Sequence, residues 1–214
     1  MKKKKSLSGK WYRYCRRKRW WSIIFDFVLL TMVVILLIPS TRRSVTAFVL
    51  RNTLLPPRES SKTIFLSDND LQLQFYDQNE DTMVLKNFDN KPVFINFWAT
   101  WCPYCVAEMP SLQKLYDRYK SKVHFLFITG EPAETVEQFL TKNGYSLPCY
   151  FYSGKPPEIF EHSSIPATYL IENGRLIVHK TGSAKWDARK FFQLMDKLVA
   201  EGKNLTDTTN LLPY

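Results

Sequence analysis

Cysteine and histidine, the residues that most often bind metals, are scarce in this sequence. The chain of 214 residues has four cysteines and three histidines. His124, His162 and His179 stand singly, and Cys15 and Cys149 each lie far from any other cysteine. A structural zinc site needs four ligands, which usually come in closely spaced pairs. We therefore expect no metal site and no bound cofactor.

Acidic residues are absent from the first nineteen positions, MKKKKSLSGKWYRYCRRKR, which hold ten Lys and Arg. The net charge of the whole chain is +10, so the excess lies entirely in this arm. The rest of the chain has no basic field that would attract a phosphate backbone. We expect no nucleic-acid partner.

Charged residues are nearly absent from the next segment, WWSIIFDFVLLTMVVILLI at 20–38, where Asp26 is the only one. As a helix it would be about 28 Å long, close to the hydrocarbon thickness of a bilayer. Cations precede it in excess, and such residues favour the cytoplasmic side of a membrane. The sequence predicts a cytoplasmic arm at 1–19, a membrane anchor in the lipid bilayer at 20–39, and a C-terminal body in the periplasm or extracytoplasmic space.

Two other interpretations of the apolar segment were weighed. A cleaved signal peptide has the same basic start and apolar run, and the small residues at 45–47 offer a cleavage site. That site lies beyond Pro39, however, and the run is long for a signal peptide, so we favour a retained anchor. A buried core helix fits poorly with the basic arm and the lack of a polar face.

The region after the anchor divides into a linker, a folded body and a tail. Pro56-Pro57 discourages a helix in the linker at 40–62, the body is predicted at 63–202, and a loose tail at 203–214. Apolar patterns predict strands at 71–77, 82–88, 92–98, 123–129, 146–152, 164–171 and 176–182. Helices are predicted from Pro103, at 132–144 and at 186–200, with a helical turn at 157–163.

The order of these elements indicates the fold class. It reads β-β-β-α-β-α-β-(α)-β-β-α, with Gly144 placed to end a helix and Asn173-Gly174 placed to form a hairpin turn. Strands and helices that alternate and end in a hairpin predict an α/β fold. We expect a mixed central sheet with helices on both faces.

Cys102 and Cys105 form the one closely spaced cysteine pair, within NFWATWCPYCVAEMP at 96–110. A disulfide that closes a two-residue loop stabilises a fold little. Zinc lacks further ligands, so redox chemistry is favoured over both structural roles.

The position of the pair supports this interpretation. Cys102 falls where a buried strand becomes a helix, so that its sulfur faces unpaired N–H groups and the positive end of the helix dipole. Pro103 suits the first helical position. Cys102 is then the attacking thiolate, and the more buried Cys105 is the thiol that resolves the mixed disulfide.

The segment FWATWCPYC resembles the active site of the thioredoxin superfamily, most closely the membrane-anchored ResA/TlpA-type thiol–disulfide oxidoreductases. The resemblance covers roughly residues 63 to 200 and includes SIPATYLI. It implies a thioredoxin-like fold in which Pro166 is a cis-proline opposite the active site and Ile165 helps to dock the substrate backbone. It also implies protein substrates with disulfides or thiols, such as apocytochrome c, and a transmembrane electron donor.

Two acid–base positions refine the resemblance. Asn96 stands where thioredoxins have a buried aspartate, and an amide cannot accept a proton. Glu108 matches a glutamate that handles protons in the ResA-like branch, one helical turn from Cys105. The alternative is that Glu108 only solvates an exposed face of the first helical turns or stabilises the helix dipole.

The residues around the pair leave the direction of the reaction open. The dipeptide Pro103-Tyr104 departs from many relatives, and such residues tune the potential over roughly −270 to −120 mV. A reductase is favoured, with an oxidase or isomerase as the alternative. A copper-delivery module is disfavoured, because those relatives have three residues between the cysteines and a committed histidine.

Three aromatic side chains and one further cysteine lie near the pair or in neighbouring apolar segments. Trp101 and Tyr104 are candidates for an apolar substrate-docking surface, whereas Trp98 is expected in the core. Cys149 lies in an apolar strand and is expected to be a small buried residue rather than a third redox thiol.

Overall fold

The computed structural model describes residues 20–37, 50, 53–60, 63–88, 91–152 and 154–209, with the backbone alone at 35–37 and 202–209. The predicted arm at 1–19, most of the linker and the last five residues lie outside this range. The chain divides into two units, Met1–Thr46 and Ala47–Tyr214. Each unit is described by itself.

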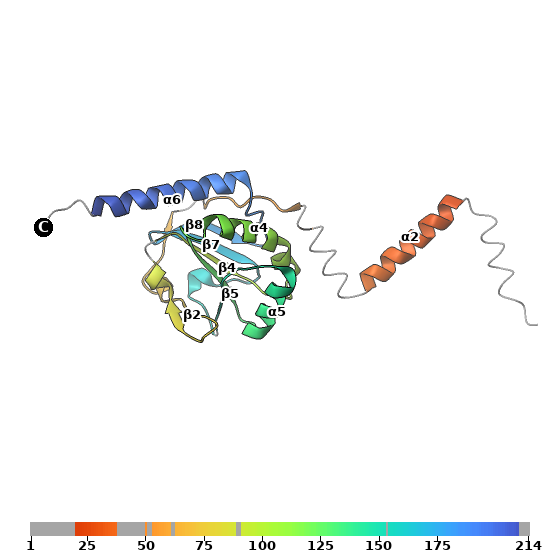
Figure 1. Ribbon diagram of the computed structural model, residues 1–214, viewed down its shortest axis with the longest axis horizontal. Coiled ribbons are helices and arrows are strands. Elements are labelled where there is room, and N and C mark those ends of the chain that lie inside the picture. The colour runs from red at the N-terminus through yellow and green to blue at the C-terminus, as the bar shows by residue number, and fades with distance from the viewer. Residues whose placement is uncertain are drawn as a thin grey trace, which may run out of the picture. The chain divides into compact units, whose positions relative to one another are not determined.

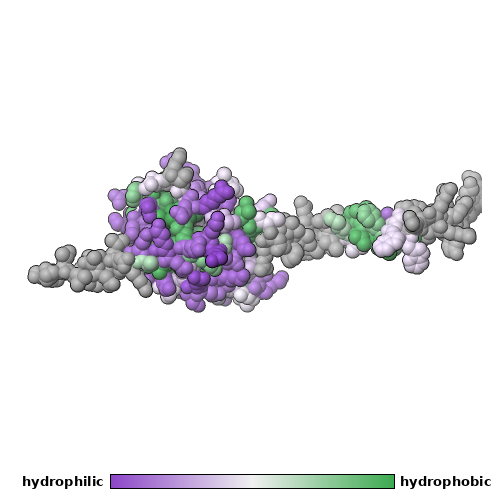
Figure 2. Space-filling view, turned by 90° about the horizontal axis from the view of Figure 1, so that it is seen from above, coloured by the Kyte–Doolittle hydropathy of each residue, from purple (hydrophilic) through white to green (hydrophobic). Residues whose placement is uncertain are grey.

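The first unit contributes the helix α2 (Trp20–Leu37). The apolar run is therefore helical over residues 20–37, as predicted. Figure 2 shows apolar side chains gathered along it, whereas polar side chains cover most of the visible face of the second unit. Among the residues with described side chains, no helix is both long enough and apolar enough to cross a membrane.

The second unit is built on a mixed sheet whose strands have the order β1-β8-β7-β4-β5-β6-β2-β3. The strands are β1 (Ile64–Phe65), β2 (Gln74–Tyr76), β3 (Thr82–Val84), β4 (Val93–Phe97), β5 (His124–Thr129), β6 (Cys149–Phe151), β7 (Ala167–Glu172) and β8 (Arg175–Thr181). β4, β5 and β6 are parallel neighbours, and the remaining pairs are antiparallel. The predicted mixed sheet is confirmed.

The long α-helices described after β4 all pack on one face of the sheet. They are α4 (Pro103–Tyr119), α5 (Ala133–Asn143) and α6 (Arg189–Thr209). Buried residues of all three join one core cluster with Phe94 of β4, whereas Ile95 faces a second cluster to which no described α-helical residue belongs. Figure 1 shows α4 and α6 along the same side of the strands.

The prediction of helices on both faces therefore fails for the described α-helices, whereas the predicted helical turn at 157–163 is present on the second face as a 3₁₀ helix. The connections β4-α4-β5 and β5-α5-β6 advance in the same direction across the sheet. Because such crossovers are right-handed, both place their helix on the same face. On the other face, residues of three short 3₁₀ segments at Asp70–Gln72, Leu85–Phe88 and Glu158–Phe160 join or pack against the second cluster.

Local turn predictions agree well with the structure. Gly144 ends α5 with φ 70°, and Asn173 and Gly174 have φ 49° and 69° in the turn between β7 and β8. The hairpin and the helix stop are thus confirmed.

Several element boundaries differ from the predictions. The 3₁₀ segments Asp70–Gln72 and Leu85–Phe88 occupy parts of two predicted strands, and β1 was not predicted. α6 begins at Arg189 rather than near 186 and continues to Thr209, so the predicted loose tail at 203–214 is helical over most of its length.

The last part of the predicted linker belongs to the folded body. The Ser60 N–H donates to the Ile177 carbonyl at 2.8 Å, and the Lys185 N–H donates to the Leu55 carbonyl at 2.9 Å. Residues 55–60 therefore lie against β8 and the loop at 182–188, and the body begins earlier than 63.

Candidate active site

Cys102 lies at the junction of β4 and α4, as the N-cap residue of the helix. Its sulfur accepts a hydrogen bond from the Cys105 N–H at 3.2 Å. Pro103 is the first helical residue and has no N–H to leave unpaired. The predicted N-cap geometry is confirmed.

A carboxylate that follows β5 holds the turn before Cys102 in place. The Thr100 N–H and hydroxyl donate to the two carboxylate oxygens of Glu131 at 2.6 and 2.8 Å. Glu131 follows β5, which pairs with β4 in parallel. The carboxyl ends of two neighbouring strands therefore hold the loop that carries Cys102.

The two thiols have opposite acid strengths. Hydrogen bonds from the Cys105 side chain and from backbone N–H groups lower the pKa of Cys102 to about 7, against the opposing effect of burial. Burial, together with the neighbouring Cys102 thiolate, raises the pKa of Cys105 far above that of a free thiol. Near neutral pH, Cys102 is thus available as a thiolate while Cys105 keeps its proton.

Glu108 is fully buried one turn beyond Cys105. Its Oε1 accepts from Asn96 Nδ2 at 3.0 Å, and its Oε2 accepts from the Ala184 N–H at 3.0 Å and from Trp186 Nε1 at 2.9 Å. The alternative that Glu108 hydrates an exposed face is excluded. Burial raises its pKa to about 7, although these three donors favour the ionised form.

Asn96 does more than replace an aspartate. Its second amide hydrogen reaches Thr168 Oγ1 of β7 at 2.8 Å, which fixes the amide in the orientation that donates to Glu108. Local sequence reasoning did not find this contact, because Asn96 and Glu108 are brought together by the packing of α4 on β4.

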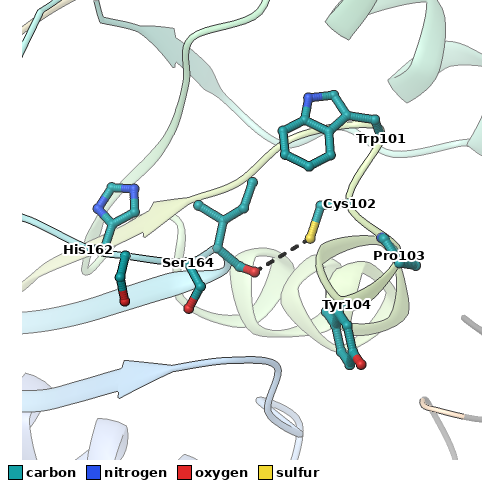
Figure 3. Close-up of a pocket in the computed structure, with 8 residues that line it drawn as sticks. Trp101, Cys102, Pro103, Tyr104, His162 and Ser164 are labelled. Carbon is teal, nitrogen blue, oxygen red and sulfur yellow. Dashed lines mark hydrogen bonds between the residues drawn. The ribbon is translucent and has the colours of Figure 1, made fainter.

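A groove of about 470 Å³ opens beside the Cys102 sulfur. Its lining comprises Trp101, Cys102, Pro103, Tyr104, His162, Ser163, Ser164 and Ile165. Figure 3 shows Trp101 and Tyr104 on either side of Cys102, with His162 and Ser164 across from them. The Cys102 thiol donates to the Ile165 carbonyl at 3.6 Å (Figure 3), and the Ile165-Pro166 bond is cis.

The structure brings together the residues that sequence reasoning proposed for the site. Trp101 and Tyr104 are 59% and 50% exposed, as expected of docking residues. Sequence reasoning missed the groove residues His162, Ser163 and Ser164; their position just before the predicted cis-proline was the one available signal. Trp186 was missed altogether.

The side chains expected in the core are buried. Trp98 packs in the same cluster as α4. Cys149 is buried in β6, and burial raises the pKa of its thiol to about 12, so it stays protonated near neutral pH.

Comparison of the chain with known proteins identifies its family. The family model described as Redoxin matches residues 38–163, more than half of the chain. A protein named thiol-disulfide oxidoreductase ResA from Halalkalibacterium halodurans is 33% identical over 124 residues, which are 56% of this chain and 70% of that protein. Its counterpart from Oceanobacillus iheyensis is 34% identical over 50% of this chain and 59% of its own length. The solution structure of a protein described as a thioredoxin, from Neisseria meningitidis, is 25% identical with a TM-score of 0.51, covering 62% of this chain and 91% of that one.

Proposed function

Because this chain belongs to the Redoxin family and is a ResA/TlpA-type thiol–disulfide oxidoreductase, we propose that it reduces protein disulfides through Cys102 and Cys105. One observation carries the proposal: a low-pKa thiol at a helix N-terminus opens into a groove, with a high-pKa thiol buried behind it. The groove supplies Trp101, Tyr104 and the Ile165 carbonyl as contacts for an extended substrate chain.

The reaction proceeds in two exchanges. The Cys102 thiolate attacks one sulfur of the substrate disulfide, and the other substrate sulfur leaves as a thiolate and takes up a proton. Cys105 then loses its proton and attacks the Cys102 sulfur, which releases the second substrate thiolate. The substrate gains two electrons and two protons, and the enzyme is left with a Cys102–Cys105 disulfide.

Glu108 is the proposed proton acceptor for Cys105. Its Oε2 already accepts two hydrogen bonds, whereas Oε1 accepts one. A carboxylate oxygen has room for two, so Oε1 retains a place for the Cys105 proton. Its pKa of about 7 lets it take up and return a proton near neutral pH.

The Cys102 pKa of about 7 supports the reductive direction. Reducing thioredoxins have a nucleophilic thiol of pKa about 7, whereas the strong oxidant DsbA has one of about 3.5, because a very stable thiolate favours the reduced form. An oxidase or isomerase is the alternative.

The reduction potential tests the direction. We expect the Cys102/Cys105 couple of the purified chain to lie closer to about −270 mV than to about −120 mV. Equilibration with dithiothreitol buffers, followed by alkylation and mass measurement, gives the value. A potential near the oxidising end would instead support the oxidase.

We further propose that residues 20–39 anchor the protein in the cytoplasmic membrane, with the arm in the cytoplasm and the catalytic body outside. The helix α2 and its apolar side chains support this. A transmembrane dithiol donor would then re-reduce the Cys102–Cys105 disulfide. The disulfide form of apocytochrome c is the substrate class that the resemblance to ResA/TlpA-type proteins implies.

The topology can be tested on intact cells. A membrane-impermeant maleimide should label Cys102 after reduction, and Cys102→Ser should remove that label. Cys15 in the predicted cytoplasmic arm serves as the internal control and should react only after the cells are permeabilised. Protection of Cys102 in intact cells would mean that the body faces the cytoplasm.

A further inference from the structure

The loop at 182–188 supplies two of the three hydrogen bonds that Glu108 accepts. The Ala184 N–H and Trp186 Nε1 both donate to Oε2, at 3.0 and 2.9 Å. These donors lie 76 and 78 residues from Glu108 in the sequence. The acid that serves Cys105 is therefore held mainly by a segment outside the cysteine motif.

The indole of Trp186 is fixed in position by packing. Its side chain is fully buried, with edge-to-face contacts to Phe94 and Phe191 at centroid distances of 5.1 Å each. Its backbone N–H donates to Ser111 Oγ at 3.3 Å, and Ser111 Oγ donates in turn to the Glu108 carbonyl at 2.8 Å. The ring cannot turn away without breaking this packing, so its N–H stays directed at Oε2.

The loop is also held from its outer side. The N–H of Lys185, between the two donors, is bonded to the Leu55 carbonyl at 2.9 Å. The segment that precedes β1 therefore supports the loop from one side while Glu108 is bound on the other.

The ionisable groups near Glu108 are few. Cys102 and Cys105 of the α4 end are its titratable neighbours, and β4 and β7 contribute only the neutral Asn96 and Thr168. On the loop, Lys185 and Asp187 flank Trp186, and Asp187 pairs with Lys114 of α4 at 2.9 Å. Among these groups no cation donates to the Glu108 carboxylate. The hydrogen bonds that counter the effect of burial on its pKa therefore come from neutral N–H donors.

We propose that Trp186 is a positioning residue of the redox reaction: its indole N–H holds Glu108 ionised and oriented, with Oε1 free to accept the proton of Cys105. This inference rests on the proposed role of Glu108. Without the indole N–H, Oε2 keeps only the Ala184 donor, and the carboxylate is favoured less over the neutral acid. A hydrogen bond to a buried charge is worth enough to shift its pKa by about one unit or more.

The resolving step can be measured apart from the attack of Cys102. Reduced protein is mixed with the aromatic disulfide dithiobis(nitrobenzoate), whose released thiolate is coloured. The first thiolate reports attack by Cys102, and the second reports attack by Cys105 on the mixed disulfide. In the second phase Cys102 is bonded and does not titrate, so the pH profile of that phase reports the proton transfer from Cys105.

Trp186→Phe keeps an aromatic ring but removes the N–H. We expect the pH midpoint of the second phase to rise by about one unit, with roughly tenfold slower release below it, while the first phase stays as in the wild type. Trp98→Phe is the matched control, because Trp98 is also buried but its Nε1 has no hydrogen-bond partner among the described residues. Its second phase should keep the wild-type midpoint.

Each other outcome counts against a different claim. If Glu108→Gln abolishes the pH-dependent rise but Trp186→Phe does not move it, the role of Trp186 is wrong and that of Glu108 stands. If Glu108→Gln keeps the wild-type profile, the proton-acceptor role fails, and the Trp186 proposal fails with it. If Trp186→Phe folds poorly, position 186 can carry benzothienylalanine instead, which has the shape of tryptophan with sulfur in place of the N–H. This variant must raise the pH midpoint of the second phase by the same amount.

Discussion

Replacing Cys105 with serine is expected to stop the reaction at a mixed disulfide between Cys102 and its substrate. Cys102 keeps its N-cap position, so it still attacks, but no thiol lies behind it to release the product. An intramolecular thiol acts at a far higher effective concentration than any added thiol, so turnover should fall by about a hundredfold or more. The trapped adduct is detected by non-reducing electrophoresis and its partner by mass spectrometry.

Cys149→Ser is the matched control for this variant, since it makes the same chemical change at a buried thiol outside the site. It should turn over normally and trap nothing, and Cys102→Ser combined with Cys105→Ser should abolish trapping. A Cys105→Ser protein that traps no partner while Cys102 remains open to alkylation would contradict the assigned roles.

Replacing Glu108 with glutamine is expected to change how stability depends on pH. Burial raises the pKa of Glu108 from 4.5 to about 7, so the folded state binds this proton more tightly than the unfolded state. The contribution of Glu108 to the free energy of unfolding of the wild type is fully present below pH 4.5 and is lost as the pH rises through about 7. Glutamine does not ionise, so the variant should gain up to about 3 kcal/mol relative to the wild type between pH 4.5 and 8.

Glutamine keeps the two hydrogen bonds that Oε2 accepts when its oxygen takes the place of Oε2, and its amide group then faces Asn96. An amide flip of Asn96 lets Oδ1, which has no partner among the described residues, accept from the glutamine and from the Thr168 hydroxyl. The flip also takes the Asn96 N–H donors away from their present partners, which offsets part of the gain.

Urea unfolding of the reduced protein at several pH values measures this effect. Glu137→Gln, at an exposed position of α5, is the control and should differ from the wild type by a small amount at every pH. A constant difference between Glu108→Gln and the wild type across this range would mean that Glu108 is ionised equally easily in both states.

The parts of the site that sequence reasoning found are those governed by local rules. Cys102 as N-cap, Pro103 at the first helical position and Cys105 one turn on follow from the geometry of a helix start. The turn at Asn173-Gly174 likewise depends on residues that prefer a positive φ. These features need no knowledge of the rest of the chain.

The missed parts depend on contacts between distant segments. The pattern around Glu108 permitted an exposed helix face as well as a buried acid, because its donors come from β4 and from the loop at 182–188. The placement of α4, α5 and α6 on one face depended on strand order, which apolar patterns do not give. The loop at 162–165 reaches the cysteines only through the pairing of β7 with β4.

The sequence by itself determined that this chain has a reactive cysteine pair at a strand–helix junction, because the residues that shape a helix N-terminus are neighbours in the chain. Tertiary structure alone decided the environment of that pair: the groove beside Cys102, the burial of Glu108 and the indole of Trp186 bonded to it. Acid strength in the interior depends on desolvation and on hydrogen-bond donors, and here two of the three donors to Glu108 lie more than seventy residues away along the chain.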